Sequence, residues 1–316
     1  MVQGSPHDSS DILTLDVDSS LDTVDAAAVR DRLEHQGVLL LRGAAPDVPS
    51  FRRLAEQLCS TSVFNESPNR ESVEADSNVQ TVDLGADAFP LHPELSREPW
   101  RPDVAMFHCI VPPGGGGETT VCDGIGIVER LPSDLVAEMA RRRLLYIRRA
   151  TPAELRFWLG TEFPSNQQLA EPPAGCPYEF RAVRGMIVRV FSRPLLHRPL
   201  FDQRLAFGNF LLFARDYLAR PNLPCLEDGS RVPDSWLDAV RAAAEPITFP
   251  IPWRAGDVAL IDNSRVMHGR RGIPDPSHRR IASYFGYLRD APVNPDEPTD
   301  PVWRREEFRP PLALAD

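Results

Sequence analysis

Near the N-terminus, segments with the apolar spacing of a helix lie on either side of a segment with the apolar run of a strand. Residues 25–36 have the spacing of an amphipathic helix and are followed by Gly37, which suits a helix end. Residues 38–43 form a short apolar run that is typical of a buried strand. Residues 50–58 predict a second helix with Ser50 as its N-cap, and its apolar face consists of Phe51, Leu54, Ala55 and Leu58.

Later segments add strands and one more helix. Residues 103–111 and 279–289 predict strands, and residues 251–261 predict a turn followed by a strand. Residues 132–142 predict a helix, whereas residues 204–214 are apolar without a periodicity that separates strand from helix. The chain has 32 prolines in 316 residues, and proline interrupts long helices and central strands. Short elements are therefore expected, and a helical bundle is not.

The same patterns bear on domain organisation. Neither an internal repeat nor a change of composition divides the chain, so we expect one domain over residues 25–290. Residues 1–24 are rich in serine and aspartate and predict a flexible lead-in. Residues 291–316 are rich in proline and predict an irregular C-terminal tail.

The charged residues exclude several classes of function. The 35 basic and 45 acidic residues give a formal net charge of −10, and every basic residue is arginine. A chain without lysine cannot use Schiff-base catalysis, attach pyridoxal phosphate or supply a P-loop lysine. An acidic chain is also a poor match for nucleic acid. We interpret the five arginines within residues 141–149 as a solvated face, the alternative being a site for a polyanion.

No feature indicates a membrane protein or a secreted one. The apolar runs are too short to span a bilayer, and the first residues lack the basic start and apolar stretch of a signal peptide. The five cysteines show no CxxC spacing, so we expect free thiols in a reducing compartment. The expected location is the cytoplasm, and the oligomeric state stays open.

Candidate metal ligands lie in two distant parts of the sequence. One residue separates His92 from Glu94, so on an extended segment both side chains project to the same side and can bind one metal ion. About one His-x-acid triplet is expected by chance in such a chain, and a structural histidine is the simpler interpretation of this motif alone. His268, which follows the predicted strand at 251–261 and precedes a glycine, is a candidate third ligand.

Two further residues extend this pattern. Arg280 lies twelve residues beyond His268, and a guanidinium near a metal can bind a carboxylate through two hydrogen bonds. Thr119 lies 27 residues after His92, at the end of a Gly-Gly-Glu-Thr sequence.

In this order the motifs resemble the taurine dioxygenase-like family of iron(II)- and 2-oxoglutarate-dependent oxygenases. The matching motifs are His-x-acid at 92–94, Gly-Gly-Glu-Thr at 116–119, Gly-Asp-Val-Ala-Leu-Ile-Asp-Asn at 256–263, His-Gly-Arg at 268–270 and Arg-Arg-Ile at 279–281. The resemblance spans residues 37–289 and is loose between 140 and 245. It implies a mostly β fold with flanking helices, built on a double-stranded β-helix (jelly roll, cupin-like) core.

The resemblance also implies roles for single residues. His92, Glu94 and His268 would ligate iron(II), which works with 2-oxoglutarate and dioxygen as cosubstrates. Arg280 would hold the distal carboxylate of 2-oxoglutarate, and Thr119 would help to hold the same molecule.

Two parts of this assignment depend on the fold. Arg279 takes the place of Arg280 if the register differs by one residue, because successive strand residues point to opposite faces. The loosely matched stretch, residues 140–245, is expected to form a lid-like insertion over the substrate.

The reaction and substrate follow less directly from the resemblance. Glu94 is typical of a subset that includes amino-acid hydroxylases, whereas related halogenases have Gly or Ala there and bind chloride. We expect hydroxylation of an unactivated C–H bond with release of succinate and carbon dioxide; desaturation or cyclisation is the alternative. The expected substrate is a small amino acid or a derivative of one, free or on a carrier protein, in secondary metabolism.

Candidate substrate contacts are Asn209 and Tyr284. Tyr284 stands where we expect the prototype's sulfonate-binding arginine, which argues against a sulfonate substrate. A non-catalytic binding or sensor barrel is the alternative from another class of function.

Overall fold

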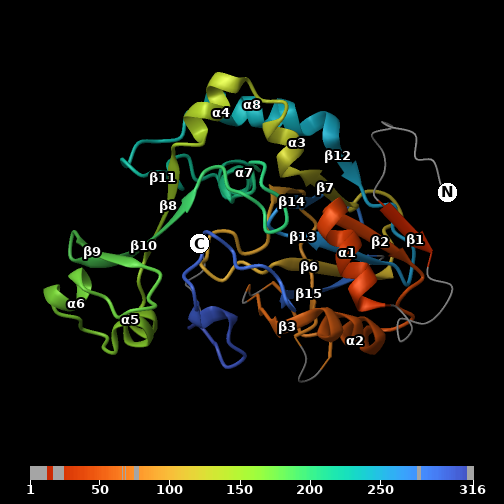
Figure 1. Cartoon of the computed structure of the whole chain (residues 1–316), viewed down its shortest axis with the longest axis horizontal. Coiled ribbons are helices and arrows are strands. Elements are labelled where there is room, and N and C mark those ends of the chain that lie inside the picture. Colours follow the sequence, from red (N-terminus) through yellow and green to blue (C-terminus); the bar gives the residue numbers. More distant parts are fainter. Residues whose placement is uncertain are drawn as a thin grey trace.

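The computed structural model describes residues 25–311, apart from residues 66, 68, 75–77 and 276–278, together with the backbone of Leu13–Asp16. The rest of the predicted lead-in over residues 1–24 lies outside the described residues. Figure 1 shows two sheets with their flanking helices on the right of the view and a third sheet extending to the left.

The largest sheet has seven strands in the order β1-β2-β13-β6-β15-β3, with β4 paired to β15. β1 and β2 run parallel, and the other neighbours pair antiparallel. The strands are β1 (Leu13–Asp16), β2 (Val38–Arg42), β3 (Cys59–Ser62), β4 (Gln80–Thr81), β6 (Val104–Val111), β13 (Val258–Asp262) and β15 (Arg280–Leu288). β6 and β15 are central and mostly buried on both faces, which explains why their sequences are continuous apolar runs.

The second sheet has four antiparallel strands in the order β12-β7-β14-β5. They are β5 (Phe89–His92), β7 (Thr119–Asp123), β12 (Thr248–Pro250) and β14 (Val266–Arg270). A core between the two sheets joins Phe107 and Phe285 of the large sheet to Val121 and Val266 of the second. Two facing sheets around one core, both mainly antiparallel, confirm the expected jelly roll.

The third sheet lies within the predicted insertion at residues 140–245. Its order is β11-β8-β10-β9, and the strands are β8 (Arg143–Arg149), β9 (Glu179–Val183), β10 (Met186–Pro194) and β11 (Cys225–Leu226). The same stretch holds α5 (Pro152–Leu159), α6 (Asn166–Ala170), α7 (Leu211–Asp216) and α8 (Asp234–Ala244). In Figure 1, β9, α5 and α6 project away from the two main sheets. α7 instead packs against β5 of the second sheet.

The first two helices show how local sequence sets helix ends. α1 (Ala26–Gln36) begins after Asp25, whose carboxylate accepts hydrogen bonds from two backbone amides, and it ends at Gly37 with φ of 76°. α2 (Val48–Leu58) begins earlier than predicted, because Asp47 and not Ser50 is its N-cap. Pro49 falls in the first turn of α2, where its missing amide hydrogen costs no helical hydrogen bond.

The remaining short elements refine the other predictions. The helix expected at 132–142 is α4 (Ser133–Met139), preceded by α3 (Gly124–Val128). Within 204–214 only the end is regular, as the start of α7. Over its described residues, 291–311, the tail is irregular apart from η4 (Val302–Arg304). Another short 3-10 turn, η2 (Glu245–Ile247), follows α8. Among the described residues, no helix has the length and apolar character needed to cross a bilayer.

Candidate active site

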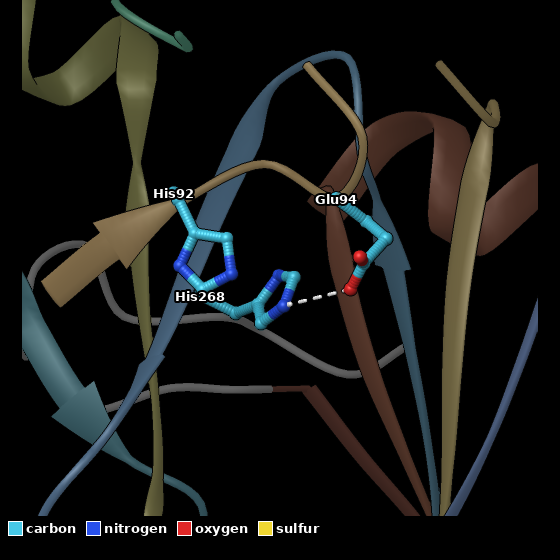
Figure 2. Close-up of side chains that lie close together, drawn as sticks. All are labelled: His92, Glu94 and His268. Carbon is cyan, nitrogen blue, oxygen red and sulfur yellow. Dashed lines mark ion pairs between the residues drawn. The ribbon is translucent and has the colours of Figure 1, made fainter. Parts of the chain in front are cut away.

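The strand ladder of the second sheet brings the three predicted metal ligands together. His92 at the end of β5 lies directly opposite His268 of β14 in an antiparallel pair. Glu94 follows two residues after His92, where the chain has left the strand. One ligand atom from each side chain lies within 4.8 Å of the others, and Figure 2 shows the three side chains converging.

Hydrogen bonds and packing orient the two imidazoles. His92 Nδ1 donates to the carbonyl of Pro90 at 2.8 Å, which leaves Nε2 available to a metal. The His268 ring packs against Phe107 with 5.1 Å between ring centroids. His268 Nε2 lies 3.7 Å from Glu94 Oε2, the contact dashed in Figure 2. His268 Nδ1 is buried and has no hydrogen-bond partner among the described residues.

The protonation states of this cluster suit a divalent metal. Burial lowers the pKa of His92 to about 3, and the neighbouring His268 adds to this effect. Burial acts to raise the pKa of Glu94, but Arg70 and the two imidazoles outweigh it and hold the pKa below its usual range. A neutral imidazole and a carboxylate are the forms in which these groups bind iron, so the donor set fits the expected ion.

Asn263 holds the backbone of the segment that carries Glu94. Its Oδ1 accepts a hydrogen bond from the Glu94 amide at 2.7 Å, and its Nδ2 donates to the carbonyls of Glu94 at 3.0 Å and Pro102 at 2.9 Å. The residue is fully buried. Sequence reasoning assigned Asn263 no role, although it lies in the Asp-Asn motif that carries the family resemblance.

The Glu94 carboxylate has two partners of its own. Asn65 Nδ2 donates to Oε1 and Arg70 donates to Oε2 at 3.1 Å. Arg70 also donates to Ser283 Oγ at 3.1 Å, so it links the loop after β3 to β15. Sequence reasoning missed both residues, because they lie in a polar loop without periodicity.

A guanidinium and a hydroxyl stand beside the three ligands, and the guanidinium is that of Arg279. Arg279 donates to the carbonyl of Gly117 at 2.7 Å and to Thr119 Oγ1 at 3.4 Å. Trp253 Nε1 donates to the same hydroxyl at 3.1 Å. Burial lowers the pKa of Arg279 to about 10, so the group stays cationic at neutral pH.

The structure corrects the placement of Arg280. Arg280 is exposed, begins β15 opposite Val111 and does not line the cavity that contains Arg279 and Thr119. Neighbouring residues of an extended segment point to opposite sides, so only one of the two arginines can face the metal ligands. The alternative register, with Arg279 inside, is the arrangement that the structure has.

The metal ligands, Arg279 and Thr119 line one cavity of about 540 Å³. An aromatic wall of Phe89, Phe210, Phe213 and Tyr217 forms one part of its surface, and the Phe213 and His92 ring centroids are 4.6 Å apart. Charged residues, among them Glu98, Arg148 and Arg189, form another part. The cavity therefore has room for a small organic molecule beside 2-oxoglutarate.

Part of the cavity surface comes from the predicted insertion at residues 140–245. Arg148 and Arg189 belong to the third sheet, and Glu154 belongs to α5. Phe213 lies on α7, against β5. Residues 140–245 thus contribute side chains to the cavity, and the lid role stays a prediction.

The two predicted substrate contacts lie elsewhere, which corrects that expectation. The side chain of Asn209 is buried and bonds to the carbonyl of Leu195 and the amide of Leu211, so it stabilises the start of α7. Tyr284 is buried in the core on the opposite face of the large sheet, with Met106 and Leu54. Neither residue lines the cavity.

Comparison with known proteins agrees with this site. The family model described as "Taurine catabolism dioxygenase TauD, TfdA family" matches residues 4–284. A dapdiamide synthesis protein of Enterobacter agglomerans is 23% identical over 325 residues, covering 93% of this chain and 96% of that protein. An alpha-ketoglutarate-dependent 2,4-dichlorophenoxyacetate dioxygenase of a Burkholderia species is 22% identical over 282 residues, covering 81% of this chain and 84% of that protein.

Solved structures show the same fold. The crystal structure of a taurine dioxygenase from Burkholderia xenovorans has a TM-score of 0.59 and 16% identity, covering 92% of this chain and 90% of that chain. The family match spans most of the sequence and confirms the resemblance read from the motifs. The chain belongs to the taurine catabolism dioxygenase TauD, TfdA family and is a non-haem iron(II)- and 2-oxoglutarate-dependent dioxygenase.

Proposed function

We propose that this dioxygenase hydroxylates an unactivated C–H bond of a small molecule, with release of succinate and carbon dioxide. The observation that carries the proposal is the convergence of His92, Glu94 and His268 in one cavity with Arg279 and Thr119. Two imidazoles and one carboxylate are the donor set of iron(II) oxygenases that keep other coordination positions open.

These residues would divide between binding the iron and binding 2-oxoglutarate. His92, Glu94 and His268 would hold the iron, which when bound supplies dioxygen activation coupled to decarboxylation of 2-oxoglutarate. Arg279 would bind the distal carboxylate of 2-oxoglutarate through its planar guanidinium, and Thr119 would donate its hydroxyl to the same group. The aromatic wall would exclude water from the reacting C–H bond.

The outcome and substrate class rest on two further features. Glu94 occupies the position that related halogenases leave to chloride, which favours hydroxylation; desaturation or cyclisation is the alternative outcome. An amino acid or a derivative, free or on a carrier protein, agrees with the Glu-type triad and with the similarity to a dapdiamide synthesis protein. Asn209 and Tyr284 are not part of this proposal, because neither lines the cavity.

Anaerobic addition of iron(II) and 2-oxoglutarate tests the site. We expect a visible charge-transfer band in the wild-type chain. Arg279→Gln should raise the 2-oxoglutarate concentration for half-maximal band intensity by about tenfold or more, because a charged hydrogen bond contributes about 1.5–3 kcal/mol. Arg280→Gln is the matched control and should leave that concentration unchanged. A larger effect of Arg280→Gln, or no band with both ligands saturating, would contradict the assignment.

Turnover tests the reaction. Mass spectrometry over a library of amino acids and carrier-bound amino acids should show succinate together with a product that has gained one oxygen atom. A product that has lost two hydrogen atoms would establish desaturation or cyclisation instead.

A further inference from the structure

A second cavity adjoins the active-site cavity. It measures about 270 Å³ and shares Arg97, Arg148, Phe210 and Leu218 with the larger one. We call it the arginine cavity, because Arg97, Arg148, Arg149 and Arg220 all line it. The shared side chains form the boundary between the two cavities.

The lining of the arginine cavity combines positive charge with an apolar surface. None of the described residues that line it is acidic. Arg149 and Arg220 are exposed and Arg97 and Arg148 are half-buried, so the guanidinium groups extend from the surface to the boundary with the active site. Most of the other lining residues are apolar, among them Ile147, Ala214, Leu223 and Pro224.

Two carboxylates, those of Glu98 and Glu154, lie on the active-site side of the boundary. Arg148 donates to Glu98 Oε1 at 3.0 Å, and Arg189 donates to both Glu98 oxygens at 3.0 and 3.2 Å. Tyr178 donates its hydroxyl to Glu98 Oε2 at 2.9 Å. Arg189 also pairs with Glu154, with 2.9 Å between Nε and Oε1.

Burial lowers the pKa of Arg97 to about 10, and repulsion from Arg148 adds to this effect. Arg149 and Arg220 lie outside these pairs, and no carboxylate among the described residues forms an ion pair with either guanidinium, so these two positive charges remain for an added anion.

The arginine run at residues 141–149 divides between two roles. Arg142 donates to Glu227 at 2.6 Å and to Asp228 at 2.7 Å, both near the surface. Arg148 and Arg149, at the end of β8, instead line the arginine cavity. The interpretation as a solvated face suits the start of the run and the exposed Arg149, whereas Arg148 is half-buried and pairs with Glu98.

We propose that the arginine cavity binds an oxyanion, a phosphate or a carboxylate, carried by the substrate, while the carbon to be oxidised lies in the active-site cavity. Planar guanidinium groups bind such oxyanions through paired hydrogen bonds, and the apolar residues would contact the carbon chain that bears the anion. The link to the substrate rests on the proposed function; the anion site itself rests on the arginines alone.

Calorimetric titration of the metal-free full chain tests the site at low ionic strength, where charge interactions are least screened. The probes are inorganic phosphate and malonate. Arg149→Gln and Arg220→Gln should each weaken binding of the preferred probe by about fivefold, since a partly exposed charged contact contributes up to about 1 kcal/mol. Arg141→Gln is the matched control, because Arg141 is an exposed arginine of the same run that does not line the cavity.

Arg279→Gln locates the bound anion. Binding that survives Arg279→Gln but weakens in Arg149→Gln and Arg220→Gln supports the proposal, and the tighter probe identifies the group as phosphate or carboxylate. The proposal is overturned if neither probe binds, if only Arg279→Gln weakens binding, or if Arg141→Gln weakens it equally.

The charge-transfer band separates this proposal from the proposed function. A wild-type chain that binds phosphate or malonate through Arg149 and Arg220 but shows no band with iron(II) and 2-oxoglutarate would overturn the proposed function alone. A normal band without anion binding would overturn the arginine cavity alone.

Discussion

Single residues decide how the metal ligands are presented. Glu94 lies outside regular structure, so no strand ladder holds its backbone. Asn263 replaces that ladder with hydrogen bonds to the amide and the carbonyl of Glu94. Residues of this kind orient ligands without touching the metal, and their loss commonly weakens metal binding.

Asn263→Ala should weaken iron(II) binding and destabilise the fold. We expect about tenfold weaker binding, as for other residues that orient metal ligands. The free energy of unfolding should fall by about 3 kcal/mol, because buried polar groups lose their partners. Anaerobic titration with iron(II) and denaturant unfolding measure the two effects.

Asn209→Ala is the control for this prediction. Asn209 is equally buried and makes two hydrogen bonds, but it lies away from the metal ligands. Its replacement should lower stability by about 2 kcal/mol and leave the affinity for iron(II) unchanged. Equal loss of iron affinity in both variants would show that Asn263 acts through general stability only.

Arg279 and Arg280 are neighbours in the sequence, and the register of β15 decides which of them faces the active site. The pair is adjacent in sequence, yet one guanidinium bonds to Thr119 and the other is exposed. Sequence spacing did not decide which of the two arginines faces the metal ligands, because a shift of one position in an extended chain moves every side chain to the opposite face. The bulge between Arg280 and Ile281 shows that spacing alone does not define the register at this end of β15.

At the scale of elements, the C-terminal segment is more than a tail. The side chain of Trp303 in η4 is 3% exposed and belongs to the same buried apolar cluster as Phe107 and Phe285 of the large sheet. Arg304 donates to both carboxylate oxygens of Asp103, at 2.9 and 2.8 Å, and lies over the ring of Tyr287. Pro311 lines the active-site cavity. An irregular segment therefore completes the core without adding a strand.

Trp303→Ala should be strongly destabilising. Truncation of a buried tryptophan costs about 3–5 kcal/mol through lost burial and the cavity that remains. The midpoint of chemical unfolding measures the effect. Val293→Ala is the control within the same segment, since Val293 is 74% exposed, and it should change stability by less than about 0.5 kcal/mol. Similar midpoints for the two variants would mean that the segment does not stabilise the fold.

At the scale of the whole molecule, the two main sheets and the metal ligands depend on each other. The pairing of β5 with β14 holds His92 opposite His268. Val266 of β14 belongs to the core between the sheets, and Leu91 of β5 packs against a second buried cluster that includes Met267 of β14. A metal ion that binds this folded arrangement and not the unfolded chain must stabilise the fold.

Metal removal should therefore lower thermal stability. At a free iron(II) concentration of about one hundred times the dissociation constant, the gain is about 2.7 kcal/mol. Differential scanning calorimetry under anaerobic conditions, with and without iron(II), should show a higher melting temperature with the metal. Glu94→Ala should remove most of this difference.

His108→Gln provides the control for metal removal. His108 is buried on β6, bonds to the carbonyl of Ala45 and stacks on Phe51, away from the metal ligands. The variant should melt at a lower temperature but keep the full increase on addition of iron(II). A metal effect that disappears in His108→Gln and persists in Glu94→Ala would contradict the site.

Much of the fold follows from local sequence. The apolar runs at 38–43, 103–111 and 279–289 predicted strands of the large sheet, and Gly37 predicted the end of α1. These predictions succeed because helix caps and strand periodicity depend on residues close in sequence. The start of α2 was misplaced because Asp47 and Ser50 are both good caps, and local sequence does not choose between them.

Residue types and their order were sufficient to name the family and the donor set of the site, because metal chemistry restricts which side chains serve. Tertiary contacts were required for the rest. Arg279 rather than Arg280 faces the ligands, Asn263 holds Glu94, and Tyr284 lies in the core instead of the cavity. Each of these facts depends on strands paired across long separations in the chain, and the energy of such pairing is absent from any short stretch of sequence.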